Sequence, residues 1–269
     1  MTAELVLTST GNSRVKAWAS LLETKHRNRT GQFLAEGIHM LVEALECGAA
    51  VRTIVYDAER GLPAELLEPL RLHGAGVELV AAARSVIAKC TGTDSPPPVF
   101  GVVDKPVADH TALFREKGLV VVLDGVRDPG NAGTIIRSAD AAGADAVVLG
   151  KGCVDLYNPK TVRSTMGSLF HLPVVEGDLA ELLPEARAKG MAIAGTSLQA
   201  ARNCYECDFT GPLWLLLGNE ADGLSETSLQ QLDYGVIIPM KGRTESLNVA
   251  MAATVVLYEA LRQREFATT

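Results

Sequence analysis

The sequence lacks any apolar run long enough to cross a membrane. Its longest apolar stretch, residues 249–258, falls well short of the roughly 18 residues that a membrane span requires. Residues 1–10 include Glu4 and lack the long apolar core of a secretory signal, so we expect no signal peptide. These two absences predict a cytoplasmic chain with no membrane partner.

Cysteine pairs, metal-ligand clusters and a complete glycine fingerprint are also missing. The five cysteines are scattered and odd in number, which suits a reducing cytoplasm. Cys204 and Cys207 form a C-x-x-C without a second pair, so two incidental thiols are a better interpretation than a zinc or redox site. His, Asp and Glu nowhere have ligand spacing, and we expect no metal. Gly130-Asn-Ala-Gly133 is only half of a G-x-G-x-x-G fingerprint, so a Rossmann nucleotide site is a weak alternative.

Positive charge is scarce overall but concentrated near the N-terminus. The formal net charge of -7 argues against a nucleic-acid partner only if the charge is evenly spread, because phosphate binding needs local positive charge. Residues 11–31 contain five basic residues and one acidic residue, and five minus one gives +4. These residues are Arg14, Lys16, Lys25, Arg27 and Arg29, against Glu23.

A proline-rich turn separates two regions of the chain. Residues 93–98 break regular structure, and residues 104–109 form a second break one short strand later. We therefore predict a first domain over 1–104, a linker over 105–112 and a second domain over 113–269. Alternating elements make the first a small α/β domain. Its predicted helices cover 13–25, 38–46, 63–73 and 83–89, and its predicted strands cover 51–56, 77–80 and 99–103.

The second region alternates apolar runs and helical patterns more clearly. The runs are almost entirely apolar, as buried parallel strands are, and the sequence has no internal repeat. We predict strands over 119–123, 146–149, 191–195, 213–217 and 235–238. We predict helices over 131–142, 158–166, 179–189, 226–232 and 247–262.

Polar clusters follow three of these predicted strands, at the edge where parallel sheets bind ligands. The first contains Asn131 and leads into a helix with Arg137, the second contains Glu220, and the third contains Ser246 and Asn248 at an expected buried corner. Taken singly, Asn131 or Asn248 can cap its helix. Arg137 can equally be a surface charge, and Glu220 a solvated turn residue. The joint occurrence of the three clusters favours a binding site.

Written as motifs, the clusters are more specific still. They read D-G-V-R-D-P-G-N-x-G-x-x-x-R from Asp124, L-L-G-N-E-x-x-G from Leu216 and I-P-M-x-G-x-x-E-S-L-N-V-x-x-A from Ile238. Together they resemble all three motifs of the SpoU (TrmH-like) RNA 2′-O-ribose methyltransferases, over residues 119–263. The stretch KHRNRTGQFLAEG, residues 25–37, more loosely resembles the ribosomal-protein-like substrate-binding domain of that family.

The resemblance implies an α/β fold in which a parallel-sheet C-terminal domain forms a deep trefoil knot, an exception to the rule against knots. It also implies a small N-terminal ribosomal-protein-like α/β domain, and a homodimer joined through apolar helix residues such as Val255 to Tyr258. The implied cofactor is S-adenosyl-L-methionine, bound by Thr196, Ser197, Leu198, Leu217, Gly218, Asn219, Gly223, Ile237, Ile238, Met240, Ser246, Leu247 and Asn248. The implied catalytic residues are Asn131, Arg137, Glu220, Ser246 and Asn248.

The implied activity is methylation of a ribose 2′-hydroxyl in RNA. The added N-terminal domain favours 23S ribosomal RNA, with transfer RNA as the alternative. The implied RNA-binding residues are Lys25, Arg27, Arg29, Lys160 and Arg163. A guanidinium has a pKa above about 12, so we interpret Arg137 as a phosphate clamp and alkoxide stabiliser, although a role as base stays open. A nonenzymatic RNA-binding protein of the same fold and an unrelated nucleotide-binding enzyme are the competing hypotheses.

Overall fold

The computed structural model describes residues 6–266, which form two compact units. The first unit ends at Val107 and also contains Tyr157–Phe170, and the second contains Ala108–Leu156 and the chain from His171 onward. Residues 1–5, part of the segment in which we expect no signal peptide, lie outside the described residues, as do residues 267–269. None of the helices in residues 6–266 is both long and apolar enough to cross a membrane.

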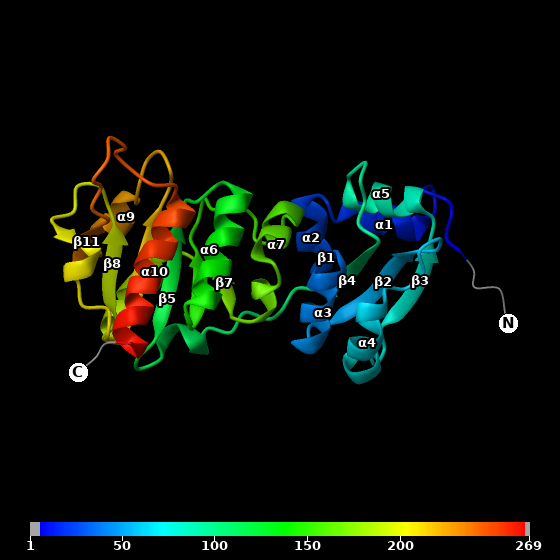
Figure 1. Ribbon diagram of the computed structural model, residues 1–269, viewed down its shortest axis with the longest axis horizontal. Helices are drawn as coiled ribbons and strands as arrows, with labels where there is room; N and C mark the ends of the chain where they lie inside the picture. Colours follow the sequence, from blue (N-terminus) through cyan, green and yellow to red (C-terminus); the bar gives the residue numbers. More distant parts are fainter. Residues whose placement is uncertain (1–5, 267–269) are drawn as a thin grey trace. The chain divides into compact units, whose positions relative to one another are not determined.

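The first unit is built on a mixed four-stranded sheet in the order β1-β4-β2-β3 (Figure 1). Only β2 and β3 run parallel, because β4 pairs antiparallel with both β1 and β2. The strands are β1 (Gln32–Glu36), β2 (Val51–Asp57), β3 (Glu78–Ala82) and β4 (Val99–Asp104). The helical elements are α1 (Ser13–Ser20), α2 (Thr24–Thr30), α3 (Ile38–Glu46), η1 (Ala64–Leu66), α4 (Leu67–His73), α5 (Arg84–Thr91), α7 (Pro159–Thr165) and η3 (Ser168–Phe170).

The N-terminal basic segment differs from its prediction. The single helix predicted over 13–25 is two helices, because α1 ends at Ser20 and the extended backbone of Glu23 starts α2 afresh. Gly31, with a φ of 68°, ends α2 in the left-handed conformation and turns the chain into β1. β1 was not predicted, since its last four residues are all buried and show no alternation.

The second unit contains a seven-stranded sheet in the order β7-β6-β5-β10-β8-β11-β9, in which every pairing is parallel. Its strands are β5 (Leu119–Asp124), β6 (Ala146–Leu149), β7 (Val174–Glu176), β8 (Ala192–Thr196), β9 (Arg202–Asn203), β10 (Leu213–Gly218) and β11 (Tyr234–Ile237). Its helical elements are η2 (Thr111–Phe114), α6 (Pro129–Ala141), α8 (Leu179–Ala188), η4 (Cys204–Glu206), α9 (Glu226–Leu229) and α10 (Val249–Glu265). The short β7 and β9 were not predicted, and α9 is shorter than predicted.

The core of this unit lies on the apolar central strands, and its helices cover both faces of the sheet. Val120 and Trp214 are fully buried in one cluster, and the indole Nε1 of Trp214 donates to the Leu113 carbonyl at 3.1 Å. On the other face α6 packs against α10, where the hydroxyls of Ser138 and Thr254 are 2.8 Å apart (Figure 1). Because the strands are parallel, β5, β10 and β11 all end at one edge of the sheet.

Candidate functional site

Asn219 joins two of the loops at this edge. Its Nδ2 donates to the Gly125 carbonyl at 2.7 Å, while its Oδ1 accepts from the amide of Ala221 at 2.9 Å. The backbones of Asn219 and Gly223 are also hydrogen-bonded in both directions. A Cβ at Gly218 would lie 2.3 Å from the Gly223 carbonyl carbon, so this close turn requires glycine at position 218.

A chain of side-chain hydrogen bonds links all three motifs. Asn131 Nδ2 donates to Glu220 Oε1 at 2.6 Å, and Asn131 Oδ1 accepts from Asn248 Nδ2 at 3.0 Å. Asn248 Oδ1 in turn accepts from the amide of Ala250 at 2.9 Å, which anchors the chain to the start of α10. Each amide is therefore fixed in orientation by its neighbours, and Glu220 is the carboxylate at the end of the chain.

The two asparagines, Asn131 and Asn248, differ in whether they cap a helix. Asp128 is the N-cap of α6, because its Oδ1 accepts from the amide of Asn131 at 2.8 Å. Capping by Asn131 itself is therefore wrong, and its side chain is available for Glu220 and Asn248. Asn248 does cap α10, and it also donates to Asn131. The expected buried corner is wrong as well, since Ser246, Leu247 and Asn248 are exposed.

Beside this chain lies a pocket of about 510 Å³. It is lined by Thr196, Ser197, Leu198, Gln199, Gly218, Asn219, Glu220, Ala221, Asp222, Gly223, Leu224, Leu229, Val236, Ile237, Ile238, Met240, Ser246, Leu247, Asn248, Val249 and Ala252. These residues come from the loops after β8, β10 and β11 and from the start of α10. Both carboxylates of the lining, Glu220 and Asp222, lie in the loop after β10.

The pocket gathers the predicted cofactor residues with one exception. Leu217 is fully buried in β10 and is absent from the pocket lining. Sequence reasoning missed Asp222 and Gln199, although Asp222 stands within the second motif and Gln199 directly follows the predicted cofactor residues 196–198. The sequence offered only their closeness to residues already predicted, because neither occupies a defined position of the three motifs.

Arg137 lies outside the pocket lining. It is six residues beyond Asn131 along α6, a rise of about 9 Å. The residue is exposed, and within the described part of the chain its side chain has no hydrogen-bond or ion-pair partner. The guanidinium is therefore available to a molecule that approaches this edge of the second unit.

The predicted RNA-binding residues of the first unit fall into two groups. Lys25, Arg29 and Lys160 are exposed, and Arg163 forms an ion pair with Glu36 at 2.6 Å. Arg27 is only 1% exposed, and its guanidinium donates to the Leu21 carbonyl at 2.7 Å and to Thr24 Oγ1 at 2.9 Å. A surface contact of Arg27 with RNA is therefore a wrong prediction, because this side chain holds α2 to the end of α1.

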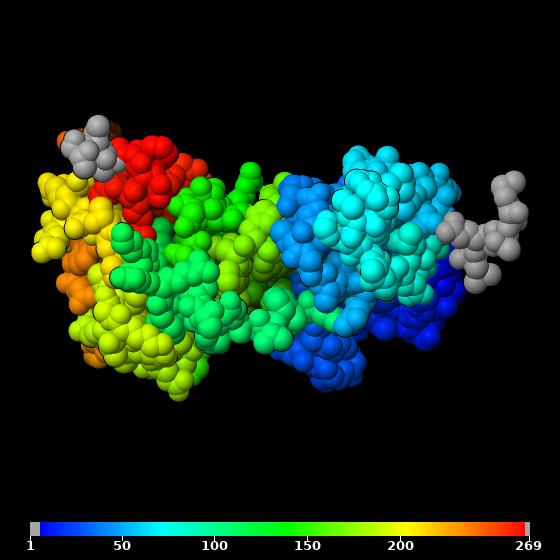
Figure 2. Space-filling model, turned by 90° about the horizontal axis from the view of Figure 1, so that it is seen from below, coloured from blue at the N-terminus to red at the C-terminus, as the bar shows by residue number. Residues whose placement is uncertain are grey.

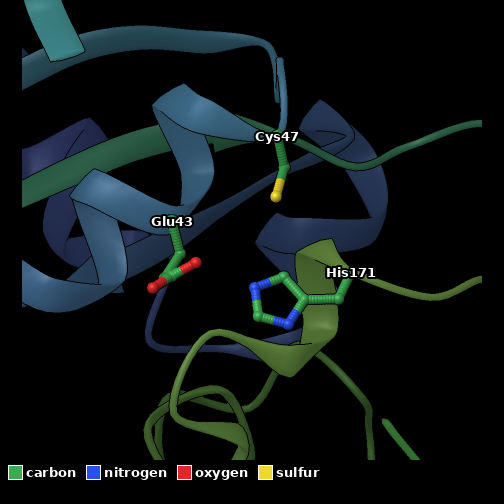
Figure 3. Close-up of side chains that lie close together, drawn as sticks. All are labelled: Glu43, Cys47 and His171. Carbon is green, nitrogen blue, oxygen red and sulfur yellow. The ribbon is translucent and has the colours of Figure 1, made fainter. Parts of the chain in front are cut away.

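Three further side chains carry atoms that can bind metals (Figure 3). Glu43 on α3 is 3.5 Å from His39 Nδ1, and Cys47 ends the same helix. His171 Nδ1 lies 2.7 Å from Asp140 Oδ2 within the second unit. Glu43 and Cys47 belong to the first unit, and two potential ligands in one unit do not define a metal site.

The fold and the pocket define a ligand-binding α/β protein of the parallel-sheet class. The SpoU rRNA methylase family model matches residues 118–258, and an MRM3-like substrate-binding domain model matches residues 12–101. The chain therefore belongs to the SpoU rRNA methylase family, as the sequence motifs indicated.

Relatives and solved structures extend over nearly the whole chain. The 23S rRNA (guanosine(2553)-2′-O)-methyltransferase RlmP of Bacillus subtilis is 37% identical, over 93% of this chain and 96% of the relative. A 23S rRNA (uridine(2479)-2′-O)-methyltransferase of Streptomyces viridochromogenes is 40% identical, over 94% of this chain and 91% of the relative. The structure of the SpoU methyltransferase AviRb from the same organism, in complex with AdoMet, aligns with a TM-score of 0.87 and 39% identity, over 96% of this chain and 100% of AviRb.

Proposed function

We propose that the protein methylates a ribose 2′-hydroxyl of 23S ribosomal RNA and uses S-adenosyl-L-methionine as the methyl donor. The observation that carries this proposal is the hydrogen-bonded chain Glu220-Asn131-Asn248 at the edge of the pocket. The relatives named as 23S rRNA 2′-O-methyltransferases favour ribosomal over transfer RNA as the substrate.

The residues that line the pocket fit this cofactor. The volume of about 510 Å³ lies within the roughly 300–1,000 Å³ of small-molecule sites. Ile237, Ile238 and Leu247 offer apolar contacts and backbone groups for the adenosine, and the carboxylates of Glu220 and Asp222 suit a cationic ligand. When bound, the cofactor supplies a methyl group activated by a sulfonium.

The protein's own contribution is positioning and electrostatics. Asn131 and Asn248 are held by each other and by the start of α10, so they can orient the ribose without rearrangement. Glu220 aligns Asn131, and as the carboxylate at the end of the hydrogen-bonded chain it accepts the proton that the ribose 2′-hydroxyl loses. We assign Arg137 to the RNA phosphate and to the developing alkoxide, because its charge is unpartnered and permanent. Ser246 completes the wall of the pocket.

We propose further that the second domain is knotted. β11 lies between β8 and β9, although β8 and β9 are joined directly by residues 197–201. A later strand thus lies between two strands that a short connection already joins, an arrangement that supports the trefoil knot. The domain limits of 1–104, 105–112 and 113–269, with RNA binding by the first domain, belong to the same proposal.

A homodimer in the cytoplasm completes the proposal. Met251 is 52% and Tyr258 49% exposed on α10, seven residues apart and therefore on one helical face with Val255. Helix α10 is in the red part of the chain in Figure 2. Val256 and Leu257 are fully buried within the chain, which leaves Met251, Val255 and Tyr258 as the dimer candidates. The five free cysteines suit a reducing compartment.

Three measurements test the proposal. Calorimetry should detect binding of S-adenosyl-L-methionine, and transcripts of 23S ribosomal RNA should gain a methyl group that alkaline hydrolysis maps to a ribose. Methylation of transfer RNA transcripts alone would overturn the ribosomal assignment, and cofactor binding without methylation of any RNA would favour the nonenzymatic hypothesis. Sedimentation of the active protein as a monomer would contradict the proposed homodimer.

A further inference from the structure

Most cations of the second unit are occupied by partners within the protein. Arg115, Arg187, Lys189 and Arg262 each form an ion pair, as Lys151 does with Asp178. Arg202 lies over the ring of Tyr234, and Arg264 donates to the carbonyls of Lys117 and Phe209.

Five cations remain. Within residues 108–156 and 171–266, the side chains without a hydrogen bond, ion pair or ring contact are those of Lys117, Arg127, Arg137, Lys241 and Arg243. All five are exposed. Other cations of this unit do form ion pairs with carboxylates. The five cations therefore do not lack partners because the unit is short of acids.

Three of these five cations lie in loops that adjoin the pocket. Arg127 stands between the end of β5 and the start of α6, four residues before Asn131. Lys241 and Arg243 lie in the loop whose two ends, Met240 and Ser246, both line the pocket. The contact between Asn131 and Asn248 joins the bases of these two segments, which lie at the top of the second unit in Figure 1. Lys117 precedes β5 and therefore lies at the opposite edge of the sheet.

We propose that Arg127, Lys241 and Arg243, here called the rim cations, bind phosphates of the RNA strand that carries the reacting ribose. The inference rests on the proposed function and adds residues to it. Unpartnered cations at a site mouth attract a polyanion at little desolvation cost, and each phosphate that they neutralise releases a condensed counterion. The acids Glu245 and Asp222, on the loops of this same edge, are not paired with them within the described residues.

The test compares two sets of substitutions in the full-length chain with a 23S ribosomal RNA transcript. The triple variant Arg127→Gln, Lys241→Gln, Arg243→Gln should bind the transcript with a salt slope smaller by about 2 to 3, at roughly 0.7–0.9 per phosphate contact. At 0.15 M salt this corresponds to roughly 50-fold weaker binding or more. The KM for RNA should rise, while kcat and the cofactor Kd stay unchanged. Lys117→Gln, the matched control, should change none of these quantities.

The charge-conserving triple variant Arg127→Lys, Lys241→Arg, Arg243→Lys should restore the salt slope. An unchanged slope in the glutamine variant, or an equal loss in Lys117→Gln, would overturn the inference. A rise in cofactor Kd with an unchanged slope would overturn it in favour of contacts to the cofactor's carboxylate. Wild-type protein that binds the transcript without methylating it would contradict the proposed function but not the rim cations.

Discussion

The basic segment of the first unit and the rim cations of the second differ in how much of their charge is available. The segment is the most basic stretch that the sequence singles out, yet Arg27 is buried in it and Arg14 is paired with Glu78. The rim lies in a unit whose cations are mostly paired, but its own three are unpartnered within the described residues. A charge count along the sequence therefore overestimates the charge that the basic segment can offer to RNA. The same count overlooks the available charge of the rim cations.

The largest expected effect concerns Arg137, an exposed cation of α6 that is unpartnered within the described residues. Arg137→Ala should lower methyl transfer by about 10²-fold or more, the scale of losing one preorganised electrostatic group. Affinity for S-adenosyl-L-methionine should stay nearly intact, because Arg137 is outside the pocket lining. Single-turnover rates and calorimetry measure the two quantities. Arg137→Lys keeps the charge without the planar fork and should recover part of the rate.

Two outcomes would contradict this assignment of Arg137. A wild-type rate in Arg137→Ala would leave it as a surface charge. A loss of cofactor binding would instead make it part of the fold or of the cofactor pocket.

Arg27 is expected to contribute to the stability of the fold and not to RNA binding. Arg27→Ala should lower the free energy of unfolding by about 2 kcal/mol, because it removes buried charged hydrogen bonds to the Leu21 carbonyl and to Thr24. The salt slope of RNA binding by the folded variant should not change. Denaturant titration measures the stability, and exposed Lys25→Ala on the same helix is the control, expected within about 0.5 kcal/mol of wild type. A stable Arg27→Ala protein with a reduced salt slope would return Arg27 to the RNA surface.

The exposed remainder of the basic segment has a smaller predicted effect. Lys25→Gln with Arg29→Gln should reduce the salt slope by about 1 to 2, since two phosphate contacts at most are lost. Cofactor affinity and the single-turnover rate at saturating RNA should not change. Arg52→Gln is a control that is also exposed, but its charge is paired with Asp104. If the double variant lowers the slope more than the rim variant does, the first unit dominates RNA binding.

Sequence predicted the second unit better than the first for a physical reason. The strands β5, β6 and β10 are buried on both faces and therefore read as continuous apolar runs. β1 is also buried, but it follows directly on a basic helix, and its pairing with β4 is a long-range contact that no local pattern encodes. β7 and β9 are too short to have a pattern of their own.

The residues of the candidate site were predicted from the sequence, but their hydrogen-bond partners were not. Motif spacing singled out Asn131, Glu220 and Asn248 as candidates, because their loops follow parallel strands. Sequence could not show that Asp128 takes the capping role and so releases Asn131, since both residue types are good caps. Nor could it show that Arg27 is buried. Long-range partners decide which polar side chains are satisfied internally and which stay available.

The smallest expected effect concerns the pairing of Arg163 with Glu36 in the first unit. Burial raises the pKa of the Glu36 carboxyl, against the opposing influence of Arg163. For an acid with a raised folded-state pKa, the stabilising contribution is fully present below the unfolded pKa and is lost as pH rises through the folded pKa. The stability advantage of wild type over Glu36→Gln should therefore shrink as pH rises above about 4.5.

Asp104→Asn is the matched control in the same unit, because a hydrogen bond from Arg52 lowers the pKa of Asp104. Its contribution is present above the unfolded pKa and is lost as pH falls, so its difference from wild type should shrink in the acid direction. Urea unfolding of the three proteins between about pH 2 and pH 8 measures both trends. If the Glu36→Gln difference instead grows with pH, the ion pair with Arg163 outweighs burial. Arg163 would then, like Arg27, be held by a partner within the protein and be unavailable to RNA, in contrast to the unpartnered rim cations.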